Sequence, residues 1–284
     1  MTALGPEPGK THKAAKAIAP ERNGVLMTEE SSIGATKGMP ATVQSIRDDL
    51  SALGVTPGMV LLVHSSLSSL GWVCGGPVAV VIALEEALGP GGTLVMPTHS
   101  GDLSEPSHWR NPPVPEDWWG IIRQTMPPYD VSMTPTRGVG VIPECFRSQE
   151  GTLRSLHPAD SFAARGPEAE MIVGEHALDF SMGDGSPLAR LYDLDGSVLL
   201  LGADFRCASS LHLAEYRANY PKKKPTRGGA PVLLEGRREW LEYQDLDLDD
   251  SDFGAIGANF AEETGLVRSG RVANGMAQLI PQRS

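Results

Sequence analysis

Cysteine and aromatic residues are scarce in this sequence, and long apolar runs are missing altogether. Only three of the 284 residues are cysteines, and no two of them lie close together in the chain. An odd, scattered set argues against a disulfide framework and against a cysteine-rich zinc site. No apolar run approaches the roughly 20 residues that a membrane helix needs. Residues 1–26 also lack the apolar segment of a signal peptide, so we expect a cytoplasmic protein that does not contact membranes.

Basic residues are also fewer than acidic residues. The chain has 24 Lys and Arg residues against 35 Asp and Glu residues, which gives a formal net charge of -11. An acidic surface repels nucleic acids and anionic membranes, and it attracts cations such as polyamines. The charge therefore argues against a nucleic-acid partner. It is compatible with a cationic substrate, although many enzymes without such a substrate are equally acidic.

The chain divides into an N-terminal extension, residues 1–40, and one α/β domain, residues 41–284. The extension is rich in Gly, Pro, Thr and Ser and has no apolar periodicity, so we expect it to be flexible. The rest of the chain alternates helix and strand patterns. The expected helices are residues 42–53, 77–88, 139–147 and 211–218, and the expected strands are residues 59–64, 93–97 and 197–202. This alternation predicts a parallel sheet, with the most apolar strand, 197–202, at its centre.

Two further segments do not fit the alternation. Residues 101–130 are rich in Pro and Trp and show little periodicity. A loop of that length inside a compact domain is usually functional. Residues 231–248 contain two strand-like runs on either side of the turn at Glu235 and Gly236. They predict a hairpin.

A hydroxyl-rich loop follows the first expected strand and precedes the glycines at 75–76. Its residues are His64, Ser65, Ser66, Leu67 and Ser68. Ligands bind at strand ends in α/β sheets, and hydroxyls beside a helix N-terminus suit a phosphate. The sequence has neither a Walker pattern nor G-x-G-x-x-G, so ATP and dinucleotides are not favoured. An ordinary polar loop would fit these residues equally well.

A histidine and a glutamate are spaced for one helix face. His212 and Glu215 are three residues apart in an expected helix, and Ser209 and Ser210 precede them as a natural N-cap. A carboxylate beside an imidazole fixes its tautomer and raises its basicity. Most isolated pairs of this spacing lie on protein surfaces and have no catalytic role, so the pair alone is weak evidence.

Two more polar segments follow. Thr134, Arg137 and Gly138 lie in a turn rich in Thr and Gly, where an arginine suits an anion such as a phosphate. The threonines are also able to cap the helix that follows. His157 precedes a proline in a loop, a position typical of a structural histidine. We therefore rank it below His212 as a base.

Together these segments resemble the aminoglycoside 3-N-acetyltransferase family, whose order they keep along the chain. They are VHSSL at 63–67, GG at 75–76, GGTLVMP at 91–97, TPTRG at 134–138, RSLHP at 154–158, GSPL at 185–188, LLLG at 199–202 and LHLAE at 211–215. The Trp-rich residues 107–119 are similar to the branch that contains the Bacillus homologues. The spread of the matches across residues 42–280 makes chance similarity improbable.

The resemblance implies a three-layer α/β sandwich that differs from the common acetyltransferase fold. It implies acetyl transfer from acetyl-CoA, without a metal, to the 3-amino group of a 2-deoxystreptamine antibiotic, and therefore antibiotic resistance. By the family pattern, His212 is the general base and Glu215 its partner. The loop at 64–68, with Thr134, Arg137 and Gly138, would hold CoA. Three carboxylates are candidates for the other ammonium groups of the acceptor: Asp184, Asp245 and Asp247.

Several alternatives remain open. The acceptor could be another amine, such as a biosynthetic intermediate. A metal hydrolase using His64, His99 and His108 is disfavoured, because these residues lack tight ligand spacing. A non-catalytic module that binds CoA or an aminoglycoside is disfavoured by the His212–Glu215 pair, since binding alone needs no base. The sequence is compatible with a monomer or a homodimer.

Overall fold

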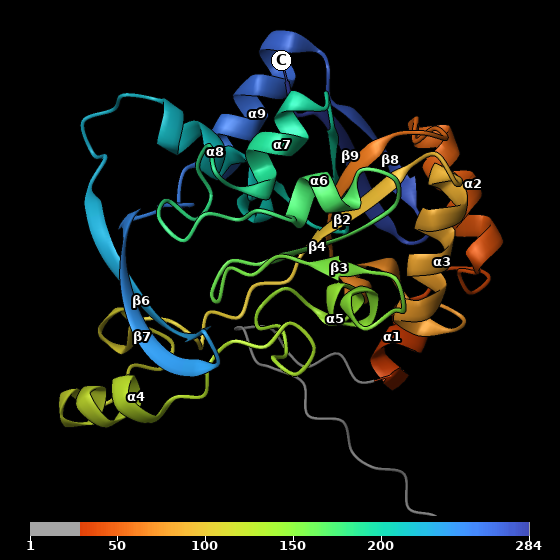
Figure 1. Cartoon of the computed structure of the whole chain (residues 1–284). Helices are drawn as coiled ribbons and strands as arrows, with labels where there is room; N and C mark the ends of the chain where they lie inside the picture. The colour runs from red at the N-terminus through yellow and green to blue at the C-terminus, as the bar shows by residue number, and fades with distance from the viewer. Residues whose placement is uncertain (1–28, 284) are drawn as a thin grey trace, which may run out of the picture.

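The computed structural model describes residues 29–283 and has a seven-stranded sheet at its centre (Figure 1). The strand order is β3-β4-β2-β1-β5-β9-β8. The bounds are β1 Val60–Ser65, β2 Thr93–Pro97, β3 Leu153–Arg154, β4 Phe162–Arg165, β5 Ser197–Leu201, β8 Arg268–Val272 and β9 Gly275–Pro281. Strand β1 pairs in parallel with β2 on one side and β5 on the other. The expected parallel sheet is confirmed for these three strands, and β5 is an interior strand as predicted.

Antiparallel strands extend the sheet at both sides. Strand β4 pairs with β2 and with β3, while β9 pairs with β5 and with β8. Their patterns did not indicate strands, and none of the four was expected from the sequence. The three parallel strands, by contrast, are covered on both faces, which explains their continuous apolar runs.

Helices cover both faces of the sheet and give a three-layer sandwich, as the resemblance implied (Figure 1). One face carries α2 Val43–Leu53, α3 Gly76–Leu88 and α5 Val141–Arg147. The other carries α6 Ala169–Val173, α7 Pro187–Asp193, α8 Ser210–Arg217 and α9 Phe253–Thr264. Successive strand residues point to opposite faces. In β1, Leu61 and Val63 accordingly belong to the first core, whereas Leu62 belongs to the second.

Helix α2 shows how local sequence sets an element's limits. The Thr42 hydroxyl accepts a hydrogen bond from the Ser45 backbone N–H, and the Ser45 hydroxyl accepts one from the Thr42 N–H. This reciprocal cap starts the helix. Gly54 ends it with a φ of 111°, a left-handed conformation that suits glycine. The helix therefore begins and ends within a residue of the sequence prediction.

A long hairpin stands apart from the sheet. It consists of β6 Pro225–Leu234 and β7 Arg237–Leu246, and its tip lies near α4 Trp119–Thr125 at the lower left of Figure 1. The Arg238 side chain joins the two elements, because its Nε donates to the Met126 carbonyl at 2.9 Å and its Nη2 donates to the Arg123 carbonyl. The segment expected as a loop, 101–130, thus contains a helix that the hairpin holds in place. The hairpin expected within 231–248 is longer than predicted.

Residues 29–40 belong to the segment expected as a flexible extension, of which residues 1–28 lie outside the described residues. Helix α1, Glu29–Ala35, is followed by Thr36, whose hydroxyl accepts a hydrogen bond from the Trp72 backbone N–H at 2.7 Å. Ala41 then pairs with Val73. The described part of the segment is therefore tied to the body of the protein.

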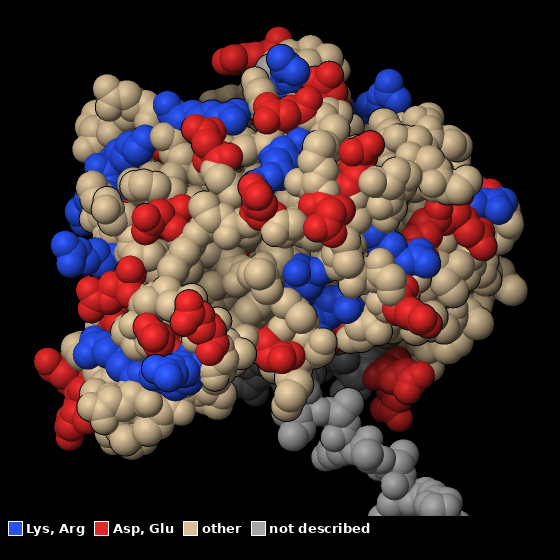
Figure 2. Space-filling model, in the orientation of Figure 1, with Lys and Arg blue, Asp and Glu red and all other residues tan. Residues whose placement is uncertain are grey.

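The net negative charge is not gathered in one place on the face shown in Figure 2, where acidic and basic side chains are interspersed. No part of this face is therefore expected to attract a cation much more strongly than the rest. Local carboxylates must provide most of any preference for a cationic ligand.

Candidate active site

The carboxyl ends of the three parallel strands meet at one edge of the sheet. His64 and the serine loop end β1, His99 follows β2, and the segment leading to α8 follows β5. From β1 the chain continues to β2 on one side and later returns to β5 on the other. Such a reversal of strand order opens a crevice at the strand ends, where ligands of α/β sheets bind. The topology therefore gathers the histidines and the serines predicted from sequence.

Helix α8 carries the His212–Glu215 pair. The Nδ1 of His212 lies 2.5 Å from Oε2 of Glu215, and both side chains are largely buried. The other carboxylate oxygen accepts hydrogen bonds from the Asp249 backbone N–H at 3.2 Å and from the Tyr220 hydroxyl at 3.4 Å. With Nδ1–H donated to Glu215, Nε2 keeps its lone pair and is able to accept a proton. Ser209 precedes the helix as predicted, although its hydroxyl makes no capping hydrogen bond.

Two other imidazoles lie near His212. His64 is buried, and within residues 29–283 its Nε2 has no hydrogen-bond partner. Burial lowers the pKa of His64 to about 3, helped by the proximity of His99 and His212. Burial also lowers the pKa of His99. Both rings are therefore neutral at physiological pH, and only His212 of the three is hydrogen-bonded to a carboxylate in the described structure.

The serine loop presents a cluster of hydroxyls beside β5. The Ser66 hydroxyl lies 3.1 Å from that of Ser68 and accepts a hydrogen bond from that of Ser69 at 3.0 Å. The Ser65 hydroxyl is buried and has no partner among the described residues. Gly202 allows the close approach of this loop to β5, since a Cβ there would lie 2.7 Å from the Ser69 Cβ. Unpaired and clustered hydroxyls are suited to a polar ligand such as phosphate or the amides of pantetheine.

The segment at 134–138 lies at the same edge of the sheet. The Arg137 backbone N–H donates to the His99 carbonyl at 2.7 Å, while the Arg137 side chain is half exposed and paired with Asp102. Arg154 donates to the Thr134 carbonyl at 2.6 Å and so fixes the turn. Gly138 is exposed, with a φ of 76°. A Cβ at Gly140, just beyond this turn, would lie 3.7 Å from the Ser65 carbonyl, so the segment approaches the serine loop. Its half-exposed guanidinium is paired with Asp102, and an anion would have to compete with that carboxylate.

His157 has a different role from His212. Its Nδ1 accepts backbone N–H groups from Ala159 and Asp160 at 3.3 and 2.9 Å, and its Nε2 donates to the Leu178 carbonyl at 3.2 Å. Both ring nitrogens are therefore occupied, and the side chain is fully buried. Such a histidine shapes the loop before β4 and is not available as a base.

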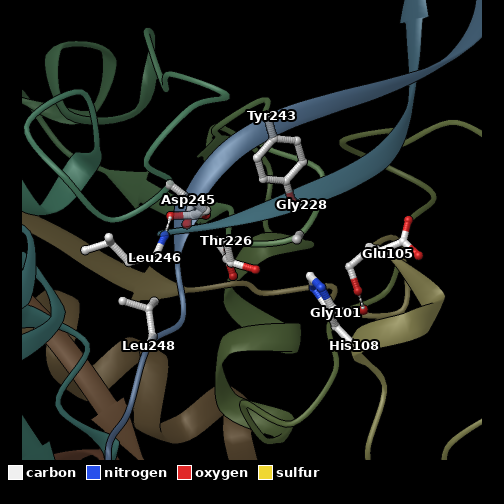
Figure 3. Close-up of a pocket in the computed structure, with 13 residues that line it drawn as sticks. Gly101, Glu105, His108, Thr226, Gly228, Tyr243, Asp245, Leu246 and Leu248 are labelled. Carbon is white, nitrogen blue, oxygen red and sulfur yellow. Dashed lines mark hydrogen bonds between the residues drawn. The ribbon is translucent and has the colours of Figure 1, made fainter. Parts of the chain in front are cut away.

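A pocket of about 220 Å³ opens beside the hairpin (Figure 3). Tyr243 and Asp245 on β7 line it together with Thr226 and Gly228 on β6, and residues 101–108 form its other side. A Cβ at Gly228 would lie 2.3 Å from the Tyr243 ring, so glycine is needed for the ring to lie across the strand. Burial raises the pKa of the Tyr243 hydroxyl, which therefore stays a hydrogen-bond donor.

The three carboxylates expected to bind the acceptor lie in different environments. Asp245 lines the pocket, is buried, and accepts a hydrogen bond from the Tyr216 hydroxyl. Asp184 is exposed and paired with Arg217 at 2.8 Å, and Asp247 is exposed 3.9 Å from Lys224. Asp160 and Ser181, which the sequence did not single out, also line the pocket. In the sequence, the only indication for Asp160 was its position two residues after the segment 154–158, which resembles the family.

The sequence model of the aminoglycoside 3-N-acetyltransferase family matches residues 62–284. The chain belongs to this family. It is therefore an acyltransferase, as the resemblance predicted. The aminoglycoside N(3')-acetyltransferase-like protein YokD of Bacillus subtilis is 48% identical over 241 residues, which cover 84% of this chain and 88% of YokD. Its crystal structure matches with a TM-score of 0.86 and covers 89% of this chain and 93% of YokD.

Two solved members of the family hold ligands. AAC-IIIb, determined with CoASH, matches with a TM-score of 0.76 and 32% identity, covering 86% of this chain and 92% of its own. AAC-VIa, bound to sisomicin, matches with a TM-score of 0.76 and 30% identity, covering 86% of this chain and 94% of its own. These matches confirm the fold type expected from sequence. They also show that relatives with this fold bind CoA and an aminoglycoside.

Neither a metal site nor a membrane span is present in the described residues. Among residues 29–283, no three His, Cys, Asp or Glu side chains are arranged to hold a metal ion. The metal-hydrolase alternative built on His64, His99 and His108 therefore receives no support from the geometry. No helix in the same residues is long and apolar enough to cross a membrane.

Proposed function

We propose that this enzyme transfers the acetyl group of acetyl-CoA to the 3-amino group of a 2-deoxystreptamine antibiotic, with His212 as the general base. The observation that carries the mechanism is the 2.5 Å contact between His212 and Glu215 at the edge where the parallel strands end. The family to which the chain belongs favours an aminoglycoside over another amine as acceptor. We further propose that the enzyme acts in the cytoplasm, without a metal, as a monomer or homodimer.

The reaction needs two proton transfers, one from the amine to His212 and one from His212 to the CoA thiolate. The neutral amine attacks the thioester carbonyl carbon, and its proton passes to Nε2 of His212 as the C–N bond forms. Glu215 stabilises the imidazolium through Nδ1–H. The tetrahedral intermediate then breaks the C–S bond, and the imidazolium returns the proton to the CoA thiolate. A backbone amide near the serine loop would stabilise the oxyanion.

We assign the binding of the two substrates to different groups of residues. The loop at 64–68, with Thr134, Arg137 and Gly138, would hold the phosphate and pantetheine parts of CoA. Support for this comes from the clustered serine hydroxyls and the exposed Arg137 guanidinium. Asp245 would bind an ammonium group of the acceptor within the pocket. Asp184 and Asp247 are exposed and would contact only ammonium groups that extend beyond it.

The test is acetylation of sisomicin and gentamicin by the purified enzyme. We expect one acetyl group to be added per antibiotic molecule, detectable by mass spectrometry, and NMR should place it on the 3-amino nitrogen. His212→Ala is the control for catalysis by the proposed base. Acetylation at another nitrogen, or no product from either antibiotic with CoA still bound, would contradict the proposal and favour a different amine acceptor.

A further inference from the structure

Both oxygens of the Glu215 carboxylate accept hydrogen bonds. Oε2 lies 2.5 Å from Nδ1 of His212, while Oε1 accepts the Asp249 backbone N–H at 3.2 Å and the Tyr220 hydroxyl at 3.4 Å. Each donor that bonds to a carboxylate stabilises its negative charge. The two donors on Oε1 therefore compete with the imidazole of His212 for the charge of Glu215.

Tyr220 lies in the segment between α8 and β6, which folds back over the end of α8. Carbonyl groups at a helix C-terminus have no partner within the helix. The Lys223 ammonium satisfies two of them here, because its Nζ donates to the Tyr216 carbonyl at 2.6 Å and to the Ala218 carbonyl at 2.9 Å. The Lys223 backbone N–H also donates to the Tyr220 carbonyl at 3.1 Å. These bonds fix the segment in the position from which the Tyr220 hydroxyl reaches Glu215.

The Tyr220 hydroxyl serves Glu215 alone. Within residues 29–283, the bond to Glu215 is the only hydrogen bond that this hydroxyl makes. Burial raises the pKa of Tyr220, and the charge of Glu215 raises it further. The hydroxyl therefore keeps its proton and remains a donor to the carboxylate.

The segment between β7 and α9 holds the pair independently of Tyr220. The Phe253 ring, which is only 2% exposed, packs against the His212 ring with 4.8 Å between the centroids. Asp249 is itself fixed by a turn, because its Oδ1 accepts the Ser251 backbone N–H at 3.0 Å. Loss of the Tyr220 hydroxyl should therefore change the distribution of charge in the pair more than its geometry.

Other titratable groups also lie near the pair. They are His64 and His99 at the strand ends, Lys222 in the segment after α8, and Asp249 and Asp252 in the segment before α9. Burial lowers the pKa values of His64 and His99. The hydrogen bonds from Ser251 lower the pKa of Asp249. Near neutral pH the two imidazoles are therefore uncharged and Asp249 is ionised, so these groups do not mask a titration of His212.

We propose that Tyr220 is a positioning residue that acts on the base through Glu215. Its hydroxyl takes up part of the carboxylate's charge and so limits how strongly Glu215 holds a proton on His212. The ring is then unprotonated, and able to accept the proton of the amine, down to a lower pH. This inference rests on the proposed function and extends it to a residue outside the His212–Glu215 pair.

The test compares the pH profiles of Tyr220→Phe and wild type, with acetyl-CoA and sisomicin as substrates. The substitution removes the hydroxyl and keeps the ring. We expect the midpoint of the kcat profile to rise by about 0.3–0.6 pH unit, which lowers kcat roughly two- to fourfold below the midpoint. The plateau at high pH and both KM values should change little. A purely structural role would lower kcat or stability at every pH and would leave the midpoint in place.

A matched control and a measurement without turnover separate the possible outcomes. Tyr192→Phe removes the same group from a half-buried tyrosine of α7, whose ring packs against Arg217, and should leave the profile unchanged. NMR of the histidine rings, with the His212 signal identified by its loss in His212→Ala, follows the titration directly. A higher midpoint in Tyr220→Phe supports the role of Tyr220 even if sisomicin is not acetylated, a result that would refute the proposed function alone. An unchanged or lower midpoint would overturn the inference, as would an equal shift in Tyr192→Phe.

Discussion

At the scale of single residues, the decisive feature is which histidine keeps a free lone pair. His212 uses one ring nitrogen for Glu215, whereas both nitrogens of His157 are bonded within the loop before β4. His64 has a pKa of about 3, because it is buried near two other imidazoles. A group that remains neutral at every physiological pH accepts a proton poorly. These contacts favour His212 as the general base that we propose.

His212→Ala should lower kcat by ~10²–10⁴-fold and leave the affinity for CoA nearly unchanged, because removing a general base affects the chemical step. Glu215→Gln should lower kcat less, since it removes the charge beside the base and retains a hydrogen-bond partner. Steady-state kinetics with CoA binding by calorimetry would measure both effects. If His157→Ala loses turnover as a folded protein while His212→Ala retains it, the assignment of the base is wrong.

Arg137→Ala should weaken the binding of CoA by roughly tenfold. This is the lower end of the range for a charge-assisted hydrogen bond, because the Arg137 side chain is half exposed. Asp102 competes for the same guanidinium. Asp102→Asn should therefore increase the affinity for CoA modestly. The KM for the acceptor should change in neither variant. Calorimetric titration with CoA is the measurement. An unchanged Kd in Arg137→Ala would assign the side chain a structural role only.

The spacing of His212 and Glu215 was sufficient to predict this pair, since residues three apart share a helix face whatever the fold. The pocket could not be predicted in the same way. Asp160, Ser181 and Tyr243 come from three separate loops and strands, and only tertiary packing brings them together. Asp245 was included among the candidates because it lies in an acidic stretch. Nothing in the sequence distinguished it from the exposed Asp247.

At the scale of elements, the helices and strands that could be predicted are those whose sequence pattern fits only one kind of secondary structure. Strand β2 and helix α3 were predicted to within a residue, because a buried parallel strand is continuously apolar and the glycines at 75–76 and 89–92 limit the helix. Strand β3 has two residues, and β8 has only one buried residue, Val272. Such strands are defined by partners that are distant in the sequence. No local pattern indicates them.

Arg238→Ala should loosen α4 from the hairpin, because the side chain satisfies two carbonyls at the end of that helix. We expect faster amide hydrogen exchange across residues 119–126, with the sheet unaffected. Exchange measured by mass spectrometry tests this. Arg237→Ala, next to it and exposed, is the control and should leave exchange unchanged. Equal exchange in the two variants would show that α4 is held by other contacts.

At the scale of the whole molecule, histidines with lowered pKa values make stability depend on pH. The pKa values of His64 and His176 are lowered to about 3, chiefly by burial. Below pH 6.5 the unfolded chain binds protons that the folded protein excludes, so stability is complete above this pH and falls towards pH 3. Each histidine adds a slope of about 1.4 kcal/mol per pH unit.

His176→Gln should reduce that slope, because glutamine does not titrate and is able to bond to Ser155 and to the Ser181 carbonyl as the imidazole does. Urea unfolding at several pH values between 7 and 5 gives the free energy of unfolding directly. Wild type should lose stability across this range faster than the variant. Parallel curves for the two proteins would show that His176 binds protons equally in the folded and unfolded states and would contradict the expectation.

The last expectation concerns how the N-terminal segment contributes to the whole. Helix α1 buries no residue, so its removal exposes little apolar surface. Thr36 nevertheless accepts the Trp72 backbone N–H, in the segment that joins the serine loop to α3. A chain starting at Pro40 should therefore keep its turnover and melt a few degrees lower than one starting at Glu29, since about 1 kcal/mol corresponds to ~2–4 °C in a protein of this size.

Thr36→Val in the longer chain removes only that hydroxyl and should reproduce part of the decrease in Tm. Thermal unfolding followed by circular dichroism measures the shift, and acetyl-CoA kinetics report on the serine loop. Loss of turnover in the chain starting at Pro40 would mean that the hydrogen bond to Trp72 positions the CoA loop as well as stabilising it. Identical Tm values for the two lengths would mean that water replaces the Thr36 hydroxyl at no cost in stability.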